Sequence, residues 1–279
     1  SSANLGPGFD ALGLALTLYD DVTGEVTADG LEIEIDGEGR ESVPTDESHL
    51  VARAMRAAFD VLGERPAGLR LRCANAIPHG RGLGSSAAAI VAGITLARAL
   101  LEDGAARLGD SATYQLATDL EGHPDNVAAA LFGGLTVAWM DGAAAGVERL
   151  ESAQQVTAFI PPDAVSTERA RGLLPDQVPH GDAAYNAGRA ALLVVALTSA
   201  PERLFAATND RLHQAYRSEA MPASYALMES LRADGVAAII SGAGPTVLAF
   251  GHGVSGRAPE GWRVLELGVA AEGAHVLTT

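Results

Sequence analysis

The chain contains no lysine: all 19 basic residues among its 279 residues are arginine. This absence excludes a Walker-type phosphate loop, whose lysine contacts the β- and γ-phosphates, and any mechanism that forms a Schiff base on lysine. The single cysteine, Cys73, excludes an internal disulfide and a cysteine-based metal cluster. Because Cys73 lies in an alternating apolar run, we expect it to pack in the core.

Long apolar runs are missing as well, and the charge is strongly of one sign. No stretch approaches the roughly 18 apolar residues of a membrane span, and no charged segment followed by an apolar one opens the chain. The formal net charge of −16 argues against nucleic-acid and lipid-surface partners, because phosphate groups require a basic face. We therefore expect a cytoplasmic protein. Since Ser1 already lies within a motif, we also expect a further N-terminal strand to precede it.

Hydrophobic periodicity predicts a layered α/β or α+β chain of two domains. In the first half it predicts strands over residues 14–18, 22–27, 31–35, 68–74 and 134–140, and helices over residues 48–62, 85–101 and 112–120. In the second half it predicts strands over 156–160, 235–240 and 246–250, and helices over 166–174, 183–197, 201–212 and 222–234. The glycine- and alanine-rich residues 142–146 and the polar stretch to Gln155 predict a linker. We accordingly place the domains at residues 1–152 and 153–279.

One glycine-rich segment, residues 78–89, reads Pro-His-Gly-Arg-Gly-Leu-Gly-Ser-Ser-Ala-Ala-Ala and runs into a predicted helix. Glycines allow backbone N–H groups to turn inward, and a helix N-terminus adds partial positive charge, so the segment predicts a phosphate site. The hydroxyl of Ser86 is placed to bind Mg²⁺. The alternative interpretation is a glycine-rich turn before an ordinary helix, which a lone G-x-G pattern usually is.

Four further polar patterns accompany this segment. The first ten residues, Ser-Ser-Ala-Asn-Leu-Gly-Pro-Gly-Phe-Asp, place Asn4 and Asp10 around a turn. Residues 121–126 hold two carboxylates, an imidazole and an amide, which suit a hard cation or a hydroxyl substrate but also a helix cap. Residues 240–246 form a glycine turn between apolar strands, either a plain turn or a second wall of a ligand site. Arg171 and Arg217 are either solvated or receptors for a carboxylate.

Together these patterns resemble the GHMP small-molecule kinases. Three motifs of that family occur in order from one end of the chain to the other: residues 2–10, Gly82-Leu-Gly-Ser-Ser-Ala-Ala88, and Ser241-Gly-Ala-Gly-Pro-Thr246. The first motif, with Glu-Gly-His-Pro-Asp-Asn and Ser-Thr-x-x-Ala-Arg, is similar to the homoserine kinase branch. The resemblance implies an α+β fold of two domains. The N-terminal domain would be like ribosomal protein S5 domain 2, with a left-handed βαβ unit, and the C-terminal domain would be ferredoxin-like, with the active site between them.

The resemblance also implies an activity, which is ATP-dependent phosphorylation of the side-chain hydroxyl of L-homoserine to O-phospho-L-homoserine, on the route to threonine. It implies ATP and Mg²⁺ as cofactors and a homodimer as a common assembly. The expected ATP-binding residues are Pro78, Gly80, Arg81, Gly82, Leu83, Gly84, Ser85, Ser86, Ala87, Ala88 and His49, with Gly242 and Gly244 in the third glycine motif. Ser86 and Glu121 are the expected Mg²⁺ ligands.

Around L-homoserine the resemblance places Asn4, Asp10, His123, Arg171 and Arg217 as substrate-binding residues, and Asn126, Glu121, Ser86, Thr167 and Asp125 as catalytic residues. Arg171 and Arg217 suit the α-carboxylate and Asp10 suits the α-ammonium group. His123, Asn126 and Thr167 suit the terminal hydroxyl. Asp125 corresponds to the aspartate that looks like a base in mevalonate kinase relatives. Because phosphoryl transfer depends mostly on positioning and charge neutralisation, we favour positioning by Asn126 over a general base.

The chain departs from the family at two positions. It has His49-Leu-Val51 where members often have Asn-Leu-Val, near the expected adenine pocket, and His213-Gln-Ala-Tyr-Arg217 where members commonly have His-Glu-Pro-x-Arg. Two alternatives stay open: a GHMP kinase acting on another alcohol of the mevalonate type, and a non-catalytic sensor of the same fold. The presence of both Ser86 and Glu121 disfavours the sensor, because ligand sensing alone needs no magnesium site.

Overall fold

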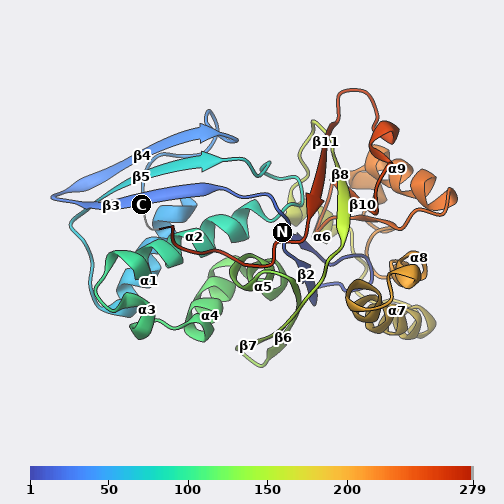
Figure 1. The fold of residues 1–279 in the computed structure, drawn as a ribbon, viewed down its shortest axis with the longest axis horizontal. Helices are drawn as coiled ribbons and strands as arrows, with labels where there is room; N and C mark the ends of the chain where they lie inside the picture. Colours follow the sequence, from blue (N-terminus) through green and yellow to red (C-terminus); the bar gives the residue numbers. More distant parts are fainter. Residues whose placement is uncertain (278–279) are drawn as a thin grey trace.

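The computed structural model describes residues 1–277, which form three sheets flanked by helices (Figure 1). The first sheet contains β3 (Asp21–Thr27), β4 (Gly30–Gly37) and β5 (Gly68–Asn75) in the order β3-β5-β4. β5 is antiparallel to β3 and parallel to β4. The connection from β4 to β5 runs through α1 (Leu50–Leu62) and completes a βαβ unit, whose handedness stays a prediction.

Two adjacent helices build the core of this half. On α1 the residues Val51, Met55, Phe59 and Leu62 recur every three to four positions and are buried, and Gly63 ends the helix in the left-handed region. The neighbouring α2 (Ser85–Leu100) is apolar on most sides and packs against α1 and the sheet. This burial fixes the N-terminus of α2, which directly follows the glycine loop, residues 78–84.

A second sheet contains β1 (Ser2–Ala3), β2 (Leu12–Leu14), β6 (Leu135–Asp141) and β7 (Ala144–Leu150), in that order. The linker predicted over residues 142–155 is therefore wrong, because β7 pairs with β6 along its whole length. Packing explains the glycine at position 146, because a Cβ atom there would lie 2.2 Å from the ring of Trp139 on β6. Between β5 and β6 the chain forms α2, α3 (Gly104–Arg107), α4 (Asp110–Glu121) and α5 (Pro124–Phe132). The hydrophobic pattern predicted neither α3 nor α5.

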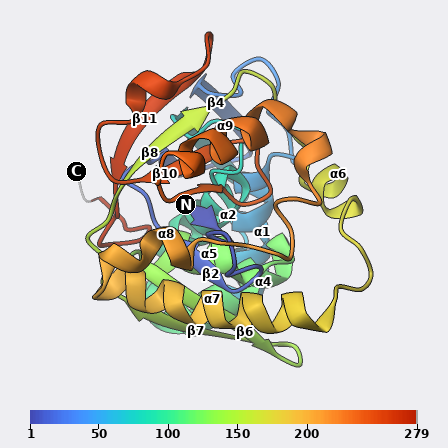
Figure 2. The same cartoon turned by 90° about the vertical axis from the view of Figure 1, so that its right-hand side faces the viewer.

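The C-terminal sheet contains β8 (Gln155–Ile160), β9 (Ala238–Ile240), β10 (Val247–Phe250) and β11 (Arg263–Gly268), in the order β11-β8-β10-β9 with all neighbours antiparallel. In chain order this is 4-1-3-2, as in a ferredoxin-like domain. Along the chain, the helices α6 (Thr167–Gly172), α7 (His180–Thr198), α8 (Leu204–Ala207) and α9 (Pro222–Ala233) all fall between β8 and β9. Figure 2 shows α7 in the lower part of the view, α9 in the upper part and α6 at the right. A single 3₁₀ turn, η3 (Ser255–Arg257), separates β10 from β11.

The helix predicted over residues 201–212 is mostly wrong. A 3₁₀ turn, η1 (Pro201–Arg203), leads into the four residues of α8, after which the chain becomes irregular. The side chains of Thr208 and Asn209 donate hydrogen bonds back to carbonyls of α8, at 2.8 Å from Thr208 Oγ1 to the Leu204 oxygen. Such local side-chain bonds compete with continuation of a helix. The irregular segment that follows, residues 208–221, carries Arg217.

The two halves share one apolar core, which includes Leu5, Leu14 and Leu83 from the first half and Ile239 and Leu248 from the second. The last described residues also return to the first half: Leu16 bridges Val269, and the Ala274 N–H donates to the Ala130 carbonyl at 2.8 Å (Figure 1). The division into domains at residues 1–152 and 153–279 remains a proposal. Within it, the segment that contains Val269 and Ala274 belongs to the second domain by sequence but contacts the first. Among residues 1–277, no helix is long and apolar enough to cross a membrane.

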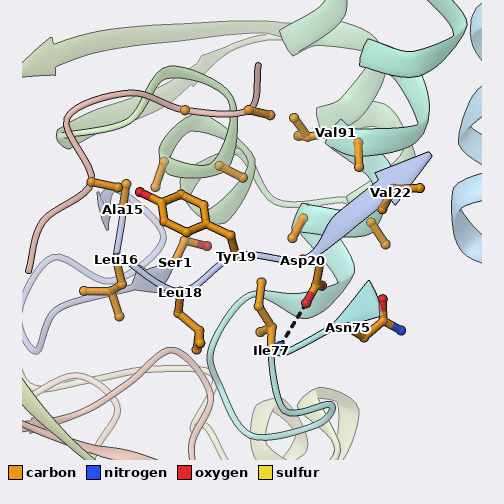
Figure 3. Close-up of a pocket in the computed structure, with 18 of the residues that line it drawn as sticks. Ser1, Ala15, Leu16, Leu18, Tyr19, Asp20, Val22, Asn75, Ile77 and Val91 are labelled. Carbon is orange, nitrogen blue, oxygen red and sulfur yellow. Dashed lines mark hydrogen bonds between the residues drawn. The ribbon is translucent and has the colours of Figure 1, made fainter. Parts of the chain in front are cut away.

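An apolar cavity of about 120 Å³ lies beside Ser1, between residues 15–22, α2 and residues 270–274 (Figure 3). Its apolar walls include Leu16, Leu18, Tyr19, Val22 and Val91. Asp20 also lines this cavity, and its carboxylate binds the backbone that leads into the glycine loop. Its Oδ1 accepts hydrogen bonds from the N–H group of Ala76 at 2.7 Å and from that of Ile77 at 2.9 Å, the second of which is drawn in Figure 3. Asp20 therefore fixes the backbone immediately before the loop.

Candidate active site

A polar cavity of about 180 Å³ lies between the two halves of the chain. It is lined by fourteen of the residues that the sequence singled out, together with Ala3 and Ala243. The fourteen are Asn4, Gly80, Gly82, Gly84, Ser85, Ser86, Glu121, His123, Asp125, Asn126, Thr167, Arg171, Arg217 and Gly242. The first ten residues, the glycine loop, the α4–α5 junction, α6, residue 217 and the third glycine motif thus meet at one place.

The glycine loop forms one wall of this cavity. Gly82 has a φ of +72°, and a Cβ atom there would lie 2.2 Å from the Ser241 carbonyl oxygen, so glycine is required for this approach. The Gly82 carbonyl accepts a hydrogen bond of 2.6 Å from Ser241 Oγ in the third glycine motif. Gly84 caps α2 in the left-handed region without a side-chain hydrogen bond. The first N–H groups of α2 are therefore available to an anion.

Ser86 and Glu121 face each other next to this loop. Ser86, in the first turn of α2, donates its hydroxyl to Glu121 Oε2 at 2.6 Å, and Glu121 is the last residue of α4. Burial raises the pKa of Glu121, while the Ser86 hydrogen bond opposes that rise. A hydroxyl and a carboxylate are hard oxygen donors, the ligand type that Mg²⁺ takes.

Ser86 and Glu121 suit a metal ion that takes its remaining ligands from the substrate rather than from the protein. In the described part of the chain no group of three or more His, Cys, Asp or Glu side chains is placed to hold a metal ion. Mg²⁺ commonly binds through one or two carboxylates plus substrate phosphates, rather than through a protein cage. Ser86 and Glu121, beside a loop suited to phosphate, match that mode.

The N-terminus of α5 presents three of the predicted residues to the cavity. His123 is the N-cap residue, Pro124 is the first helical residue, and Asp125 and Asn126 follow. Asp125 is buried, and its Oδ1 accepts the Asn126 N–H at 2.8 Å. Burial raises the pKa of Asp125 to about 6, and the charge of Asp10 adds to the rise. Burial also lowers the pKa of His123, assisted by the charge of Arg171.

The signals that define α5 are present in the sequence. Proline at the first helical position, an acidic residue in the first turn and glycine after the last turn (Gly133) are ordinary helix boundaries. The motif at residues 121–126 was interpreted either as a helix cap or as part of a ligand site, and its position is compatible with both. It ends one helix, caps the next, and places its side chains in the cavity.

Arg171, which lines the cavity, forms a bidentate ion pair with Asp10, which lies outside the cavity wall. Arg171 Nη2 lies 2.6 Å from Asp10 Oδ1, and Nη1 lies 3.2 Å from Oδ2. The expectation that Arg171 binds a carboxylate and Asp10 an ammonium group treats the two as separate, whereas here each is the partner of the other. The guanidinium also lies 5.5 Å from the centre of the Phe9 ring.

Arg217 differs from Arg171 in having no carboxylate partner within 4 Å among residues 1–277. The residue is 1% exposed, and its guanidinium lies 5.2 Å from the centre of the Phe9 ring. Burial and the neighbouring charge of Arg171 lower the pKa of Arg217 to about 10. Because a buried charge without a counterion is costly, this side chain is suited to receive an anionic group from the cavity.

Several predicted residues lie outside the cavity wall or use their polar atoms elsewhere. Arg81 donates to the carbonyls of Pro161 (3.0 Å), His79 (3.0 Å) and Pro162, so its guanidinium joins the glycine loop to the second half instead of lining the cavity. Asn4 lines the cavity, but its amide donates to the Gly242 carbonyl and accepts the Asp10 N–H. The others outside the wall are His49, Pro78, Leu83, Ala87, Ala88, Asp10 and Gly244.

His49 is buried at the N-cap of α1, and its Nδ1 has no hydrogen-bond partner among residues 1–277. Its adenine role, like the roles of the other site residues, stays a prediction. Sequence reasoning assigned no role to Phe9, whose ring lies under both arginines, nor to His213, whose Nδ1 is 3.3 Å from Arg217 Nη1. The position of Phe9 within the first motif was the available signal.

Comparison with known proteins agrees with this arrangement. Sequence signatures described as "GHMP kinases N terminal domain" and "GHMP kinases C terminal" match residues 49–134 and 193–258. A homoserine kinase from Streptomyces avermitilis is 60% identical over 284 residues, covering 99% of this chain and 93% of the relative.

Solved structures agree as well. A homoserine kinase from Cytophaga hutchinsonii superposes with a TM-score of 0.84 at 24% identity, covering 98% of this chain and 93% of that one. A putative homoserine kinase from Listeria monocytogenes superposes with a TM-score of 0.76 at 30% identity, covering 100% and 96%. The first of these likenesses supports the two-domain fold alone. By its identity to the Streptomyces protein over nearly the whole length, this chain belongs to the homoserine kinase family of the GHMP kinases.

Proposed function

We propose that this protein transfers the γ-phosphoryl group of ATP to the side-chain hydroxyl of L-homoserine, with Mg²⁺. One observation carries the proposal: a single cavity is lined on one side by a loop suited to phosphate and on the other by the buried guanidinium of Arg217, which has no carboxylate within 4 Å among residues 1–277. The first wall is the glycine loop with the N-terminus of α2, and the second is Arg217 beside the Arg171–Asp10 pair. A small acid with a hydroxyl group suits the space between them.

The phosphates of ATP would lie along the glycine loop, where N–H groups and the positive end of α2 offset their charge. Ser86 and Glu121 would hold Mg²⁺, which when bound neutralises charge on the transferring phosphoryl group. Arg217 would bind the α-carboxylate. Asp10, held in place by Arg171, would face the α-ammonium group with its remaining lone pairs. A mevalonate-type alcohol has no ammonium group and would leave this carboxylate without a substrate partner.

His123, Asn126 and Thr167 would orient the terminal hydroxyl toward the γ-phosphorus. The hydroxyl oxygen forms the new bond to phosphorus as the bond to the β–γ bridging oxygen breaks, and the hydroxyl proton leaves late, to a phosphate oxygen. Asp125 is an alternative proton acceptor, but its Oδ1 already accepts the Asn126 N–H. We therefore assign the main contribution to positioning by Asn126.

The test is ATP consumption with Mg²⁺ and, in separate reactions, L-homoserine, mevalonate, galactose and shikimate. We expect turnover with L-homoserine far above the other three. Preferential turnover of mevalonate would favour the alternative alcohol kinase, and binding of homoserine without ATP consumption would favour a sensor. The homodimer, the cytoplasmic location and the absence of nucleic-acid and membrane partners remain predictions.

A further inference from the structure

His213 contacts Arg217 but is not among the residues that line the cavity. It belongs to the irregular segment after α8, and its ring is fully buried. The imidazole stacks against Phe9 with ring centres 5.1 Å apart. His213 is therefore enclosed by the same ring that lies under Arg217, and the proposed mechanism gives it no contact with either substrate.

The two ring nitrogens of His213 have different partners, and these fix its protonation state. Nε2 lies 2.8 Å from the Gly6 carbonyl oxygen, which can only accept, so Nε2 carries the hydrogen. Nδ1 lies 3.3 Å from Nη1 of Arg217, which can only donate, so Nδ1 carries the lone pair. Both contacts are satisfied only by the neutral imidazole with hydrogen on Nε2.

The charges around His213 are consistent with a neutral ring. Burial lowers its pKa, and the cation of Arg217 opposes protonation, while Asp210 and Asp10 favour it. Asp210 is the nearest carboxylate, 3.8 Å from Nε2. Its oxygens, however, already accept the N–H groups of Leu212 (3.0 Å), His213 (3.1 Å) and Gln214 (2.8 Å). Asp210 thus shapes the turn that carries the ring.

From these contacts we propose that neutral His213 is a positioning residue that aims the Arg217 guanidinium into the cavity by joining it to the carbonyl of Gly6. Arg217 has few other fixed partners: Nε has none, and no carboxylate lies within 4 Å in residues 1–277. His213 Nδ1 is the acceptor that orients its terminal nitrogen. The inference rests on the proposed function, because it assumes that Arg217 binds the substrate carboxylate.

The test compares three substitutions. His213→Leu removes both contacts, His213→Asn keeps an acceptor near the position of Nδ1, and His213→Gln keeps a donor near the position of Nε2. His252→Leu, at an exposed histidine, is the matched control. For each variant we would measure KM for L-homoserine, KM for ATP, and the inhibition constant of 3-aminopropan-1-ol, which is homoserine without its carboxylate.

We expect His213→Leu to raise KM for L-homoserine by at least about tenfold, the loss of one hydrogen bond to a charged group. KM for ATP and the inhibition constant of 3-aminopropan-1-ol should stay within about twofold, because neither ligand uses Arg217. His213→Asn should recover most of the KM and His213→Gln should not. In an Arg217→Met background, His213→Leu should change KM by less than about twofold.

Equal losses for homoserine and 3-aminopropan-1-ol, or additive effects in the double variant, would overturn the inference in favour of a purely structural role. If His213→Leu does not fold, the comparison of His213→Asn with His213→Gln tests the inference. A lower KM for L-homoserine in His213→Gln than in His213→Asn would then overturn it. Unchanged KM in every variant of an active enzyme contradicts this inference alone. A wild-type protein that does not phosphorylate homoserine contradicts the proposed function instead.

Discussion

Arg171 donates both of its terminal nitrogens to the carboxylate of Asp10, at 2.6 and 3.2 Å, although the two residues are 161 positions apart. The pair joins the first motif to α6, whose Arg171 lines the cavity. Asp10 also offsets the like charges of Arg171 and Arg217, which lie over the same Phe9 ring. A carboxylate expected to serve the substrate thus also holds the site together.

Removing that carboxylate should weaken substrate binding more than ATP binding. We expect Asp10→Asn to raise KM for L-homoserine by about tenfold or more, because the ammonium partner is lost and two guanidinium groups are left with one counterion fewer. Asp36→Asn, at an exposed ion pair with Arg40, should leave KM unchanged. Steady-state kinetics with varied homoserine checks both. An unchanged KM in Asp10→Asn would remove Asp10 from the proposed substrate site.

If Ser86 and Glu121 bind Mg²⁺, a substitution at Glu121 should change how activity depends on the Mg²⁺ concentration. Glu121→Gln should lower kcat by about a hundredfold or more, and it should raise the Mg²⁺ concentration at half-maximal activity, because a neutral amide is a weaker ligand for a hard cation. The control is Glu102→Gln, at an exposed position after α2. Activity titrated with MgCl₂ gives both numbers. A loss of kcat with the same Mg²⁺ dependence as wild type would contradict a ligand role for Glu121.

The conformation of the glycine loop predicts that one added methyl group, at Gly82, strongly lowers the stability of the protein. Gly82→Ala should destabilise the protein by roughly 2 kcal/mol or more, because alanine is strained at positive φ and its Cβ would meet the Ser241 carbonyl. ATP affinity should fall with it. Gly188→Ala, on an open face of α7, should instead be neutral or stabilise by about 0.5–1 kcal/mol. Denaturant unfolding of both variants checks this contrast, and equal stabilities would contradict the described contact.

Asp125 predicts a pH dependence of stability whose sign follows from burial. Its pKa is about 6 in the folded protein against 3.8 for the ordinary side chain. The folded state therefore binds the proton more tightly, and this group's contribution to stability is lost as pH rises through that window. Asp125→Asn should gain stability relative to wild type between about pH 4 and pH 7, by roughly 2–3 kcal/mol.

The measurement is the free energy of unfolding at several pH values, with Asp176→Asn, in an exposed loop, as the control. A difference between Asp125→Asn and wild type that does not change with pH would contradict the raised pKa. The same variant tests the proton question. We expect it to retain at least about a tenth of the wild-type kcat, whereas Asn126→Ala should lose more, because positioning contributes most to this reaction. The reverse order would make Asp125 a general base.

Local patterns were sufficient for most of the fold. The 3.6-residue period predicted α1, and a nearly continuous run of small and apolar residues predicted α2, both to within two residues. Strand-like apolar runs predicted β3, β5 and β8. Predictions failed where contacts of individual side chains, rather than the hydrophobic pattern, decide the structure. The glycine of β7 is required by Trp139 on the neighbouring strand, and α8 ends because of side-chain bonds from Thr208 and Asn209. β11, an edge strand with mixed polarity, was not predicted.

The site followed the same division. Motifs predicted which segments meet, and most of the chosen residues line one cavity. Partner choice was not predictable, since it depends on contacts between distant positions: Asp10 with Arg171, Asn4 with Gly242, and His213 with both Gly6 and Arg217. Arg81 shows the limit clearly, because a basic residue in a phosphate loop suggests phosphate binding, yet its guanidinium contacts three backbone carbonyls.

The most direct measurement is ³¹P NMR of a reaction containing the protein, ATP, MgCl₂ and L-homoserine. The proposal predicts a new phosphomonoester signal, that of O-phospho-L-homoserine, growing in equal amount with ADP, and growing about a hundredfold or more slowly when Glu121→Gln replaces the wild type. ADP accompanied by inorganic phosphate, or a phosphomonoester that forms from mevalonate but not from homoserine, would contradict it.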